Sequence, residues 1–416
     1  MMSSIIPANE YCVKIFDGTH DTPKSVKNGR PLVTSKNILG GKLNLIDTYN
    51  ISEENYRSIQ KRSAVSQWDV LFSMIGSIGE VYLEKNKDIS YAIKNVGVFS
   101  CGDEYKAKWL YYYLLSPASK TFIKNYLVGA VQKFLALGTL REYPVLLFDS
   151  SKKGSVDLLY VLDSKIELNN QINAELESMA KTLYDYWFVQ FDFSNKNDKP
   201  YKTSGGKMVF NEKLKKEIPE GWEVKNLKNN SLTKLLKPKI DKFKNEKIYL
   251  ATADVQSNEI NFQAEKIIFD DRPSRANMQP IENSVWFAKM KNSKKILYFG
   301  NYSKEFLEKS ILSTGFTGLK CNKEYYLEYI WGFIKNDYFE LVKDTIASAS
   351  TQEAINNDEM AFIKLVIPTD DILKKYNDKT KGIYQKIYKN QIANQKLVEL
   401  RDWLLPMLMN GQVTVN

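Results

Sequence analysis

Two long stretches of this chain repeat apolar residues at the three- and four-residue spacing of a coiled-coil seam. One runs from Val156 to Phe191 and the other from about Ile372 to Met409. The seam residues are Leu158, Leu162, Ile172, Leu176, Met179, Leu183 and Tyr186 in the first stretch, and Ile383, Ala393, Leu397, Leu400, Leu404 and Met407 in the second. Each stretch therefore predicts a long helix with one apolar face to bury.

The two seams superpose at one constant offset along the chain, and their polar interruptions superpose with them. The matched pairs are Leu162 with Ile383, Lys165 with Lys386, Asn169 with Asn390, Leu176 with Leu397, Met179 with Leu400, and Leu183 with Leu404. We interpret this as an internal duplication. The asparagines either fix the register of the two helices or, like the lysines, face a partner or solvent.

The segments before each helix resemble one another more weakly. Val70-Leu71-Phe72 resembles Val285-Trp286-Phe287, Cys101 aligns with Cys321, Gly129–Gln132 aligns with Ala349–Gln352, and an apolar strand precedes each helix at Pro144–Phe148 and Lys364–Pro368. Further strands are expected at 69–75, 81–83, 295–299 and 362–367, and further helices at 107–115 and 325–337. The fold class is α/β or α+β, with two globular units and two long helices.

We expect five segments along the chain. They are a first globular unit at 1–150, a central spacer helix at 151–193, a polar linker or exposed hairpin at 194–222, a second globular unit at 223–368, and a C-terminal spacer helix at 369–416. A helix of about 35 residues is about 50 Å long. If the two helices pack antiparallel, they hold dissimilar units a fixed distance apart, as a bipartite duplex DNA target requires, since half-sites on one face lie about 34–36 Å apart.

The composition fits a polyanionic partner without requiring one. Lys and Arg exceed Asp and Glu by 59 to 49, which favours nucleic acid but also fits a lysine-rich solvated surface. The three cysteines are widely separated and predict neither a disulfide framework nor a zinc site. No run approaches the ~20 apolar residues of a membrane helix, and we expect a soluble, cytoplasmic protein with no membrane partner.

Most catalytic chemistries lack their motifs here. There is one histidine, His20, and the chain has no phosphate-binding loop, no GxSxG and no Pro-Pro pair. Asp370 and Asp371 superficially resemble a nuclease cluster, but they suit the first turn of the helix that follows. We expect no catalytic residue, no metal site and no cofactor bound by this chain.

Several segments resemble a known family, the specificity subunits of type I restriction-modification systems. They are FDGTHDTPK (Phe16 to Lys24), DVLFSMIGSIGEVYL (Asp69 to Leu83), LYDYWFVQFDF (Leu183 to Phe193), KPYKTSGGKMVFNEKLKKEIPEGWEV (Lys199 to Val224) and LRDWLLPMLMNGQV (Leu400 to Val413). With the duplication, the resemblance covers nearly the whole chain. The second globular unit departs most from the family's patterns.

The resemblance implies that the globular units are two target-recognition domains, each reading one half of an asymmetric DNA target. It implies assembly on double-stranded DNA with two methyltransferase subunits, which use S-adenosylmethionine on an adenine taken out of the duplex. It also implies restriction subunits that translocate DNA with ATP and Mg. These cofactors would belong to the partners.

Candidate DNA contacts come from polar loops and repeated amides. Lysines are expected on phosphates, glutamines on adenine, and Arg272 and Arg275 on guanine. They are Thr19, His20, Lys24, Lys27, Arg30, Gln132 and Lys133 in the first unit, and Lys237, Lys239, Lys242, Arg272, Arg275, Lys289, Lys291 and Gln352 in the second. His20 is expected to contact DNA or shape its loop, and the glutamines to read a base or stabilise a loop.

Two functions from other classes compete with this interpretation. A coiled-coil scaffold could bind proteins through two related domains. A stand-alone DNA-modifying enzyme would need the motifs that are missing. Salt-sensitive binding to duplex DNA with a methyltransferase partner discriminates against the first, and methyl transfer by the isolated chain would reveal the second.

Overall fold

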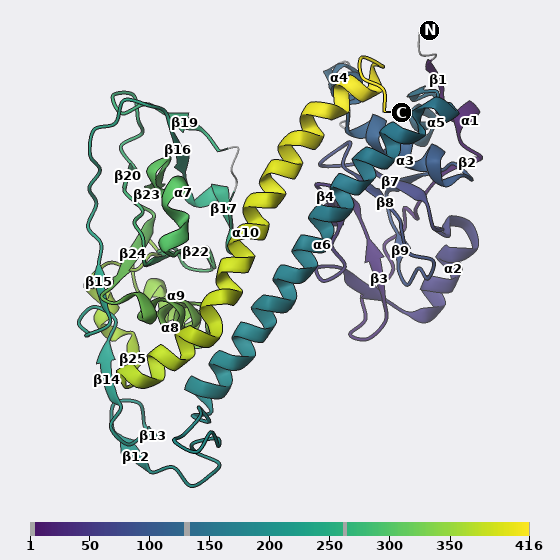
Figure 1. Ribbon diagram of the computed structural model, residues 1–416. Helices are drawn as coiled ribbons and strands as arrows, with labels where there is room; N and C mark the ends of the chain where they lie inside the picture. Colours follow the sequence, from purple (N-terminus) through teal and green to yellow (C-terminus); the bar gives the residue numbers. More distant parts are fainter. Residues whose placement is uncertain (1–4, 129–133, 261–263, 416) are drawn as a thin grey trace. The chain divides into compact units, whose positions relative to one another are not determined.

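The computed structural model describes residues 5–128, 134–260 and 264–415, which form two compact units (Figure 1). Unit 1 comprises Met1–Leu168 and Lys396–Asn416, and unit 2 comprises Asn169–Gln395. The two long helices, α6 (Lys153–Tyr184) and α10 (Asp370–Met409), each contribute one part to unit 1 and the other part to unit 2. None of the helices in these described ranges is long and apolar enough to cross a membrane.

Unit 1 is built around a four-stranded antiparallel sheet. Its strand order is β2 (Lys14–Asp17), β10 (Val96–Ser100), β7 (Asp69–Ser73) and β8 (Val81–Leu83). The smaller sheets are β6 (Tyr49–Ile51), β3 (Arg30–Val33) and β9 (Ala92–Ile93); β1 (Ile5–Pro7) with β11 (Pro144–Leu146); and β4 (Ile38–Leu39) with β5 (Lys42–Leu43). The helices are α1 (Ala8–Tyr11), α2 (Glu53–Ser63), α3 (Glu104–Leu115), α4 (Pro117–Val128) and α5 (Leu137–Arg141).

Unit 2 is built around a sheet of the same kind. Its strand order is β15 (Thr233–Leu235), β24 (Phe316–Cys321), β21 (Ser284–Ala288) and β22 (Ile296–Phe299), again antiparallel. The other strands are β19 (Lys266–Ile267), β16 (Lys247–Leu250), β23 (Ser310–Ser313) and β20 (Ala276–Met278); β14 (Glu223–Asn226) with β25 (Lys364–Ile367); β17 (Val255–Gln256) with β18 (Glu259–Ile260); and the hairpin of β12 (Met208–Asn211) and β13 (Lys216–Pro219). The helices are α7 (Lys304–Glu308), α8 (Leu327–Lys335) and α9 (Asp337–Ser348).

The registers of the two sheets make the duplication explicit. In unit 1, Ser100 of the central strand pairs with Lys14 on one side and Asp69 on the other. In unit 2, Lys320 pairs in the same way with Lys234 and Ser284. The sheets are therefore equivalent strand by strand, which confirms the predicted repeat, including the likeness of β7 to β21 and the matched positions of Cys101 and Cys321.

Aromatic side chains fill the core beside each sheet. In unit 1, Phe72, Phe99 and Tyr143 are fully buried and meet edge to face with ring centroids 6.0–6.5 Å apart. In unit 2, Phe287 and Phe339 are buried and meet edge to face at 4.9 Å. Each such ring stabilises its unit by about 1.5–3 kcal/mol through burial, so each unit has a substantial core of its own.

The long helices pack against each other within each unit. In unit 1, Val156 and Leu159 of α6 share a buried cluster with Leu405 and Leu408 of α10. In unit 2, Asn169 donates to Asn394 at 2.7 Å, and Asn390 donates to Asn173 at 2.8 Å. These two bonds are related by the offset that superposes the seams. The asparagines are thus internal register contacts, because Asn169 and Asn390 are 3% and 4% exposed.

The buried face of the helices differs from the predicted seam at several positions. Met179 and Leu400 were expected in the seam but are 60% and 41% exposed, and Ala180 and Leu405 are buried instead. Tyr186, also expected in the seam, is 37% exposed. Leu162 is buried, whereas the other predicted seam residues are partly buried: Leu158, Ile172, Leu176, Leu183, Ile383, Ala393, Leu397, Leu404 and Met407. Lys165 and Lys386 are exposed. A straight helix drifts by about 20° per heptad, so a fixed heptad frame loses the buried face over this length.

Local chemistry marks the start of α10. Asp370 and Asp371 lie in its first turn, where negative charge is favoured. The Lys323 ammonium, with the hydroxyl groups of Tyr326 and Tyr325, lowers the pKa of Asp370 to about 2. These acids begin a helix, as the sequence suggested, and are held by side chains of unit 2.

Candidate nucleic-acid interface

The polar loop of unit 1 follows edge strand β2. Thr19 was expected to contact DNA, but it is 7% exposed, and its hydroxyl accepts a hydrogen bond from the Asp21 amide at 3.2 Å. Its own amide donates to the Ile93 carbonyl at 3.0 Å. Because a buried hydroxyl that bonds its own loop cannot reach a groove, Thr19 shapes the loop.

His20 lies on the surface between two polar side chains. Its Nδ1 is 2.8 Å from Asn95 Oδ1, and its Nε2 is 3.1 Å from Asp17 Oδ2. The ring is 68% exposed, while Asp17 is 16% exposed. The ring thus holds a carboxylate and an amide together at the surface, an arrangement for hydrogen bonding.

The cations of this loop differ in their freedom to bind phosphate. Lys24 and Lys27 are exposed. Arg30 is bonded to Glu53 at 2.9 Å and lies over the Tyr56 ring, 5.3 Å from its centroid. A phosphate would have to compete with Glu53 for Arg30, so the two lysines are the stronger candidates.

Gln132 and Lys133 lie outside the described residues, but the chain that follows them is placed. Phe134 forms an antiparallel bridge with Ile75, and the Leu135 amide donates to the Met74 carbonyl at 3.0 Å. Ile75 and Phe134 are 44% and 39% exposed. Just beyond strand β7, Ile75 and Phe134 thus place two apolar side chains on the surface.

The lysines of unit 2 follow the equivalent edge strand. Continued past the ladder, the register places Lys237 at the position of Asp17 and Lys239 at that of Thr19. Lys237, Lys239 and Lys242 are exposed. The polar loop after β2 and the lysines after β15, which the sequence suggested separately, therefore occupy equivalent places in the two units.

Phe269 brings two further candidates of unit 2 together. The Arg272 guanidinium lies 4.1 Å from the Phe269 ring centroid, and Lys242 lies 5.8 Å from it on the same ring. Arg272 also donates to the Phe269 carbonyl at 2.6 Å, so part of its fork is already engaged. Arg275 is exposed and lies directly before β20.

A backbone pairing joins the last candidates of unit 2. Met290 forms an antiparallel bridge with Ala354, and the Ile355 amide donates to the Lys289 carbonyl at 3.0 Å. Burial lowers the pKa of Lys289. Lys291 is 3.2 Å from Glu353, and Gln352 is exposed beside them. This site matches the Ile75–Phe134 bridge of unit 1, with Lys289 where unit 1 has Met74.

Sequence reasoning missed Asp17, Asn95 and Phe134. Asn95 precedes β10 and has a left-handed backbone, with φ of 52°. A polar residue in that conformation between two apolar strands is a turn signal that could have identified it. Phe134 comes two residues after the predicted Gln132, but only the strand pairing reveals that it lies beside Ile75.

We expect Lys237→Ala with Lys239→Ala to weaken DNA binding for every sequence. The slope of the logarithm of the binding constant against the logarithm of the salt concentration should decrease in magnitude by up to about 1.8, because each phosphate contact contributes about 0.9. Fluorescence anisotropy across a salt series measures this slope. Lys196→Ala with Lys199→Ala, two exposed lysines after α6, is the matched control. An unchanged slope would remove Lys237 and Lys239 from the interface.

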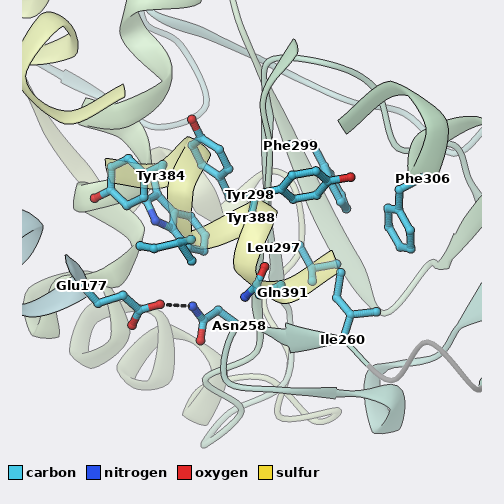
Figure 2. Close-up of a pocket in the computed structure, with 12 residues that line it drawn as sticks. Glu177, Asn258, Ile260, Leu297, Tyr298, Phe299, Phe306, Tyr384, Tyr388 and Gln391 are labelled. Atoms are coloured by element: carbon cyan, nitrogen blue, oxygen red, sulfur yellow. Dashed lines mark hydrogen bonds between the residues drawn. The ribbon is translucent and has the colours of Figure 1, made fainter. Parts of the chain in front are cut away.

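Unit 2 contains a small cavity that belongs to its core. It lies among Tyr298, Trp331, Tyr384 and Tyr388, and Asn258 donates to Glu177 at its rim (Figure 2). Its volume is about 40 Å³, enough for little more than a water molecule. Among residues 5–128, 134–260 and 264–415, no three His, Cys, Asp or Glu side chains are grouped as a metal site.

The arrangement defines a class of protein, a duplicated recognition protein whose two units carry different polar surfaces at equivalent positions. Comparison with known proteins agrees. The family model for the type I restriction modification DNA specificity domain matches residues 24–178. Over this segment the chain is similar to the DNA specificity domain of type I restriction-modification systems.

Two proteins that are similar to this chain along most of its length are type I restriction enzyme specificity subunits. The chain is 25% identical over 392 residues to the type I restriction enzyme MjaIX specificity subunit of Methanocaldococcus jannaschii, which covers 88% of this chain and 82% of that protein. It is 22% identical over 421 residues to the HindI specificity subunit of Haemophilus influenzae, with 85% and 88% covered. A crystal structure of the type I S subunit from M. genitalium has the same fold, with a TM-score of 0.53, 13% identity, and 97% and 95% of the chains covered.

Proposed function

We propose that this chain is the DNA-recognition subunit of a type I restriction-modification enzyme, in which each unit reads one half of an asymmetric bipartite target. The observation that carries this proposal is the contrast between equivalent positions. Asp17 and Met74 of unit 1 correspond to Lys237 and Lys289 of unit 2. One scaffold with different side chains at the same places suits the reading of two different sequences.

The chain would place partner enzymes over the target and carry out no chemistry itself. S-adenosylmethionine, ATP and Mg would be bound by the methyltransferase and restriction subunits. The family relationship and the missing catalytic motifs support this division of work. The family relationship does not favour the alternative of a protein-binding scaffold outside restriction-modification.

The long helices offer two matching apolar surfaces for two copies of one partner. The motif at the end of α6 exposes Tyr186 (37%), and the related motif near the end of α10 exposes Trp403 (64%). Met179 lies on the surface near the first, and Leu400 near the second. Met179 and Leu400 are equivalent by the offset of the seams, and exposed apolar groups that recur near the end of each helix are typical of protein interfaces. We propose that each surface binds one methyltransferase subunit.

Co-expression of the chain with its methyltransferase partner tests the function. Methylation-aware sequencing of the host DNA is expected to reveal one asymmetric target with two defined parts and an undefined spacer. The purified chain alone, given DNA and a labelled methyl donor, is expected to transfer no label. Methylation without a sequence preference, or transfer by the chain alone, would contradict the proposal.

A further inference from the structure

A pocket of about 450 Å³ opens at the surface of unit 1, at the carboxyl end of edge strand β2. Its polar end is formed by Asp17, His20 and Asn95, and its apolar wall includes Met74, Ile75 and Phe134. The volume lies in the range of small-ligand sites. The pocket combines an apolar wall with convergent hydrogen-bonding groups, and the proposed function names no ligand for it.

We propose that this pocket receives one nucleobase that carries an exocyclic amino group and has left the DNA duplex. The inference rests on the proposed function, because the base comes from the bound target. A base must leave the stack to enter such a pocket. It would be a recognition event of unit 1 itself, separate from the adenine that the methyltransferase takes up.

The apolar wall suits the face of a base. Phe134 is 39% exposed and is held against Ile75 by the bridge between their backbones. The backbone of strand β7 continues into this bridge, so the ring projects from a fixed support. A phenyl face accepts any base by stacking, which gives affinity without sequence preference.

The polar end supplies the preference. Asp17 offers a carboxylate, which only accepts hydrogen bonds, and His20 fixes it through a 3.1 Å contact. Asn95 Oδ1 lies 2.8 Å from His20 Nδ1. When the ring donates through both nitrogens, to Asp17 and to Asn95, the amide nitrogen of Asn95 is the group left to donate. An acceptor beside a donor matches the amino group and ring nitrogen of adenine or cytosine, and the carboxylate also suits guanine. Thymine carries the pair in the reverse order, with its donor on the ring (N3–H) and its acceptors outside the ring, so it fits this order of groups less well.

Unit 2 lacks this chemistry at the equivalent place. Lys237 stands where unit 1 has Asp17, Lys289 where it has Met74, and Ala354 where it has Phe134. Two cations without an aromatic wall suit a phosphate and not a base. The pocket is therefore a property of unit 1, and its effect should be confined to one half of the target.

Fluorescent base analogues test the pocket in the assembled complex. With the target known from methylation mapping, 2-aminopurine or a fluorescent cytosine analogue replaces each amino-bearing base of the duplex in turn. The full chain with its methyltransferase partner is expected to give a several-fold rise at one position of one half-site, besides the methylated adenine. Phe134→Ala should abolish that rise and weaken binding about tenfold, as the loss of one base–aromatic stack predicts. Phe210→Ala, at an exposed phenylalanine of the β12–β13 hairpin, is the control.

Asp17→Asn separates reading from folding, because it preserves shape and changes only the acceptor. The variant is expected to keep the salt dependence of binding but to accept thymine at that one position when the target is mapped again. Asp21→Asn, at an exposed residue of the same loop, should keep the original target.

The outcomes distinguish the pocket from the function on which it rests. Absence of sequence-specific methylation by the unaltered complex would contradict the proposed function. Normal methylation with no additional extrahelical base, or with a signal that survives Phe134→Ala, would overturn the pocket alone. Binding of free adenosine or cytidine by the chain without DNA, in a form that DNA does not displace, would identify an effector site and also overturn it.

Discussion

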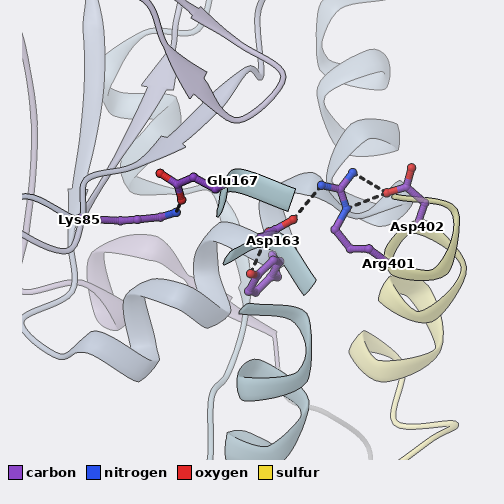
Figure 3. Close-up of polar contacts among 6 residues, drawn as sticks. Lys85, Asp163, Glu167, Arg401 and Asp402 are labelled. Atoms are coloured by element: carbon purple, nitrogen blue, oxygen red, sulfur yellow. Dashed lines mark hydrogen bonds and ion pairs between the residues drawn. The ribbon is translucent and has the colours of Figure 1, made fainter. Parts of the chain in front are cut away.

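Replacing Arg401 with methionine is expected to lower the free energy of unfolding of unit 1 by about 3 kcal/mol. Arg401 of α10 lies 2.9 Å from Asp163 of α6, which also accepts the Tyr112 hydroxyl at 2.9 Å (Figure 3). Their side chains are only 25% and 15% exposed. Burial by itself lowers the pKa of Arg401, but Asp163 and Asp402 raise it above its ordinary value. Removing the guanidinium therefore leaves a largely buried carboxylate without its cation.

Urea denaturation of the full chain measures this loss, followed by a probe in unit 1, because two units need not unfold together. Lys85→Met is the matched control. Its ion pair with Glu167 is short, at 2.6 Å, but 32% and 51% exposed, and should contribute at most about 1 kcal/mol. Adding Asp163→Asn to Arg401→Met should recover part of the loss, because the unpaired charge is then gone. Equal effects of the Arg401 and Lys85 variants would show that the Arg401–Asp163 pair is solvated.

The sequence predicted the duplication because the repeat is written in features that a single chain displays. Strands β7 and β21 each contain a continuous run of apolar residues, so both were identified from hydrophobicity alone. Asn169 and Asn390 marked the register because a polar residue in an apolar seam is conspicuous. The asparagine bonds of unit 2 use the offset that these residues define.

The exposed side of the helices was harder to predict. Met179 and Leu400 are apolar and fit a heptad. One sequence does not distinguish an apolar residue that packs within its own chain from one that contacts another molecule. Both are exposed, whereas Ala180, with less apolar surface, is buried. If the proposed partner surfaces are correct, apolar residues meant for another subunit were counted as this chain's own core.

The two units also carry opposite charges at one equivalent buried position. Lys108 of α3 and Glu328 of α8 lie at the same separation from Cys101 and Cys321, and both are buried. Lys108 lies 3.5 Å from the Tyr160 ring centroid, whereas Glu328 accepts from the Tyr298 hydroxyl at 2.8 Å and from Asn377. Such substitutions erase sequence similarity while each unit compensates locally.

The sequence predicted which basic loops could belong to the candidate interface, but not how the fold arranges them. Basic loops were identified, yet the equivalence of Lys237 with Asp17 depends on sheet register. The approach of Phe134 to Ile75 depends on a pairing between segments far apart in sequence. Non-local contacts of this kind carry no signal in a short sequence window.

Changing Trp403 to serine is expected to reduce the methyltransferase content of the complex from two copies to one. An exposed indole is the kind of side chain that dominates interface energies, and its truncation typically costs about 2 kcal/mol or more. Because 64% of Trp403 is exposed, the change should leave the stability of unit 1 within about 0.5 kcal/mol. Tyr186→Ser should remove the other copy, and the double variant should retain neither.

Mass photometry of the purified complexes counts the bound subunits directly, and circular dichroism checks that each variant is folded. Tyr338→Ser, at a 40% exposed tyrosine of α9 outside both helix-end motifs in sequence, should retain both copies. DNA binding by the double variant should persist, because neither aromatic residue belongs to the candidate interface. If the double variant still carried two methyltransferase subunits, the matching surfaces of α6 and α10 would have no role in assembly. The duplication would then have to be explained by the DNA target alone.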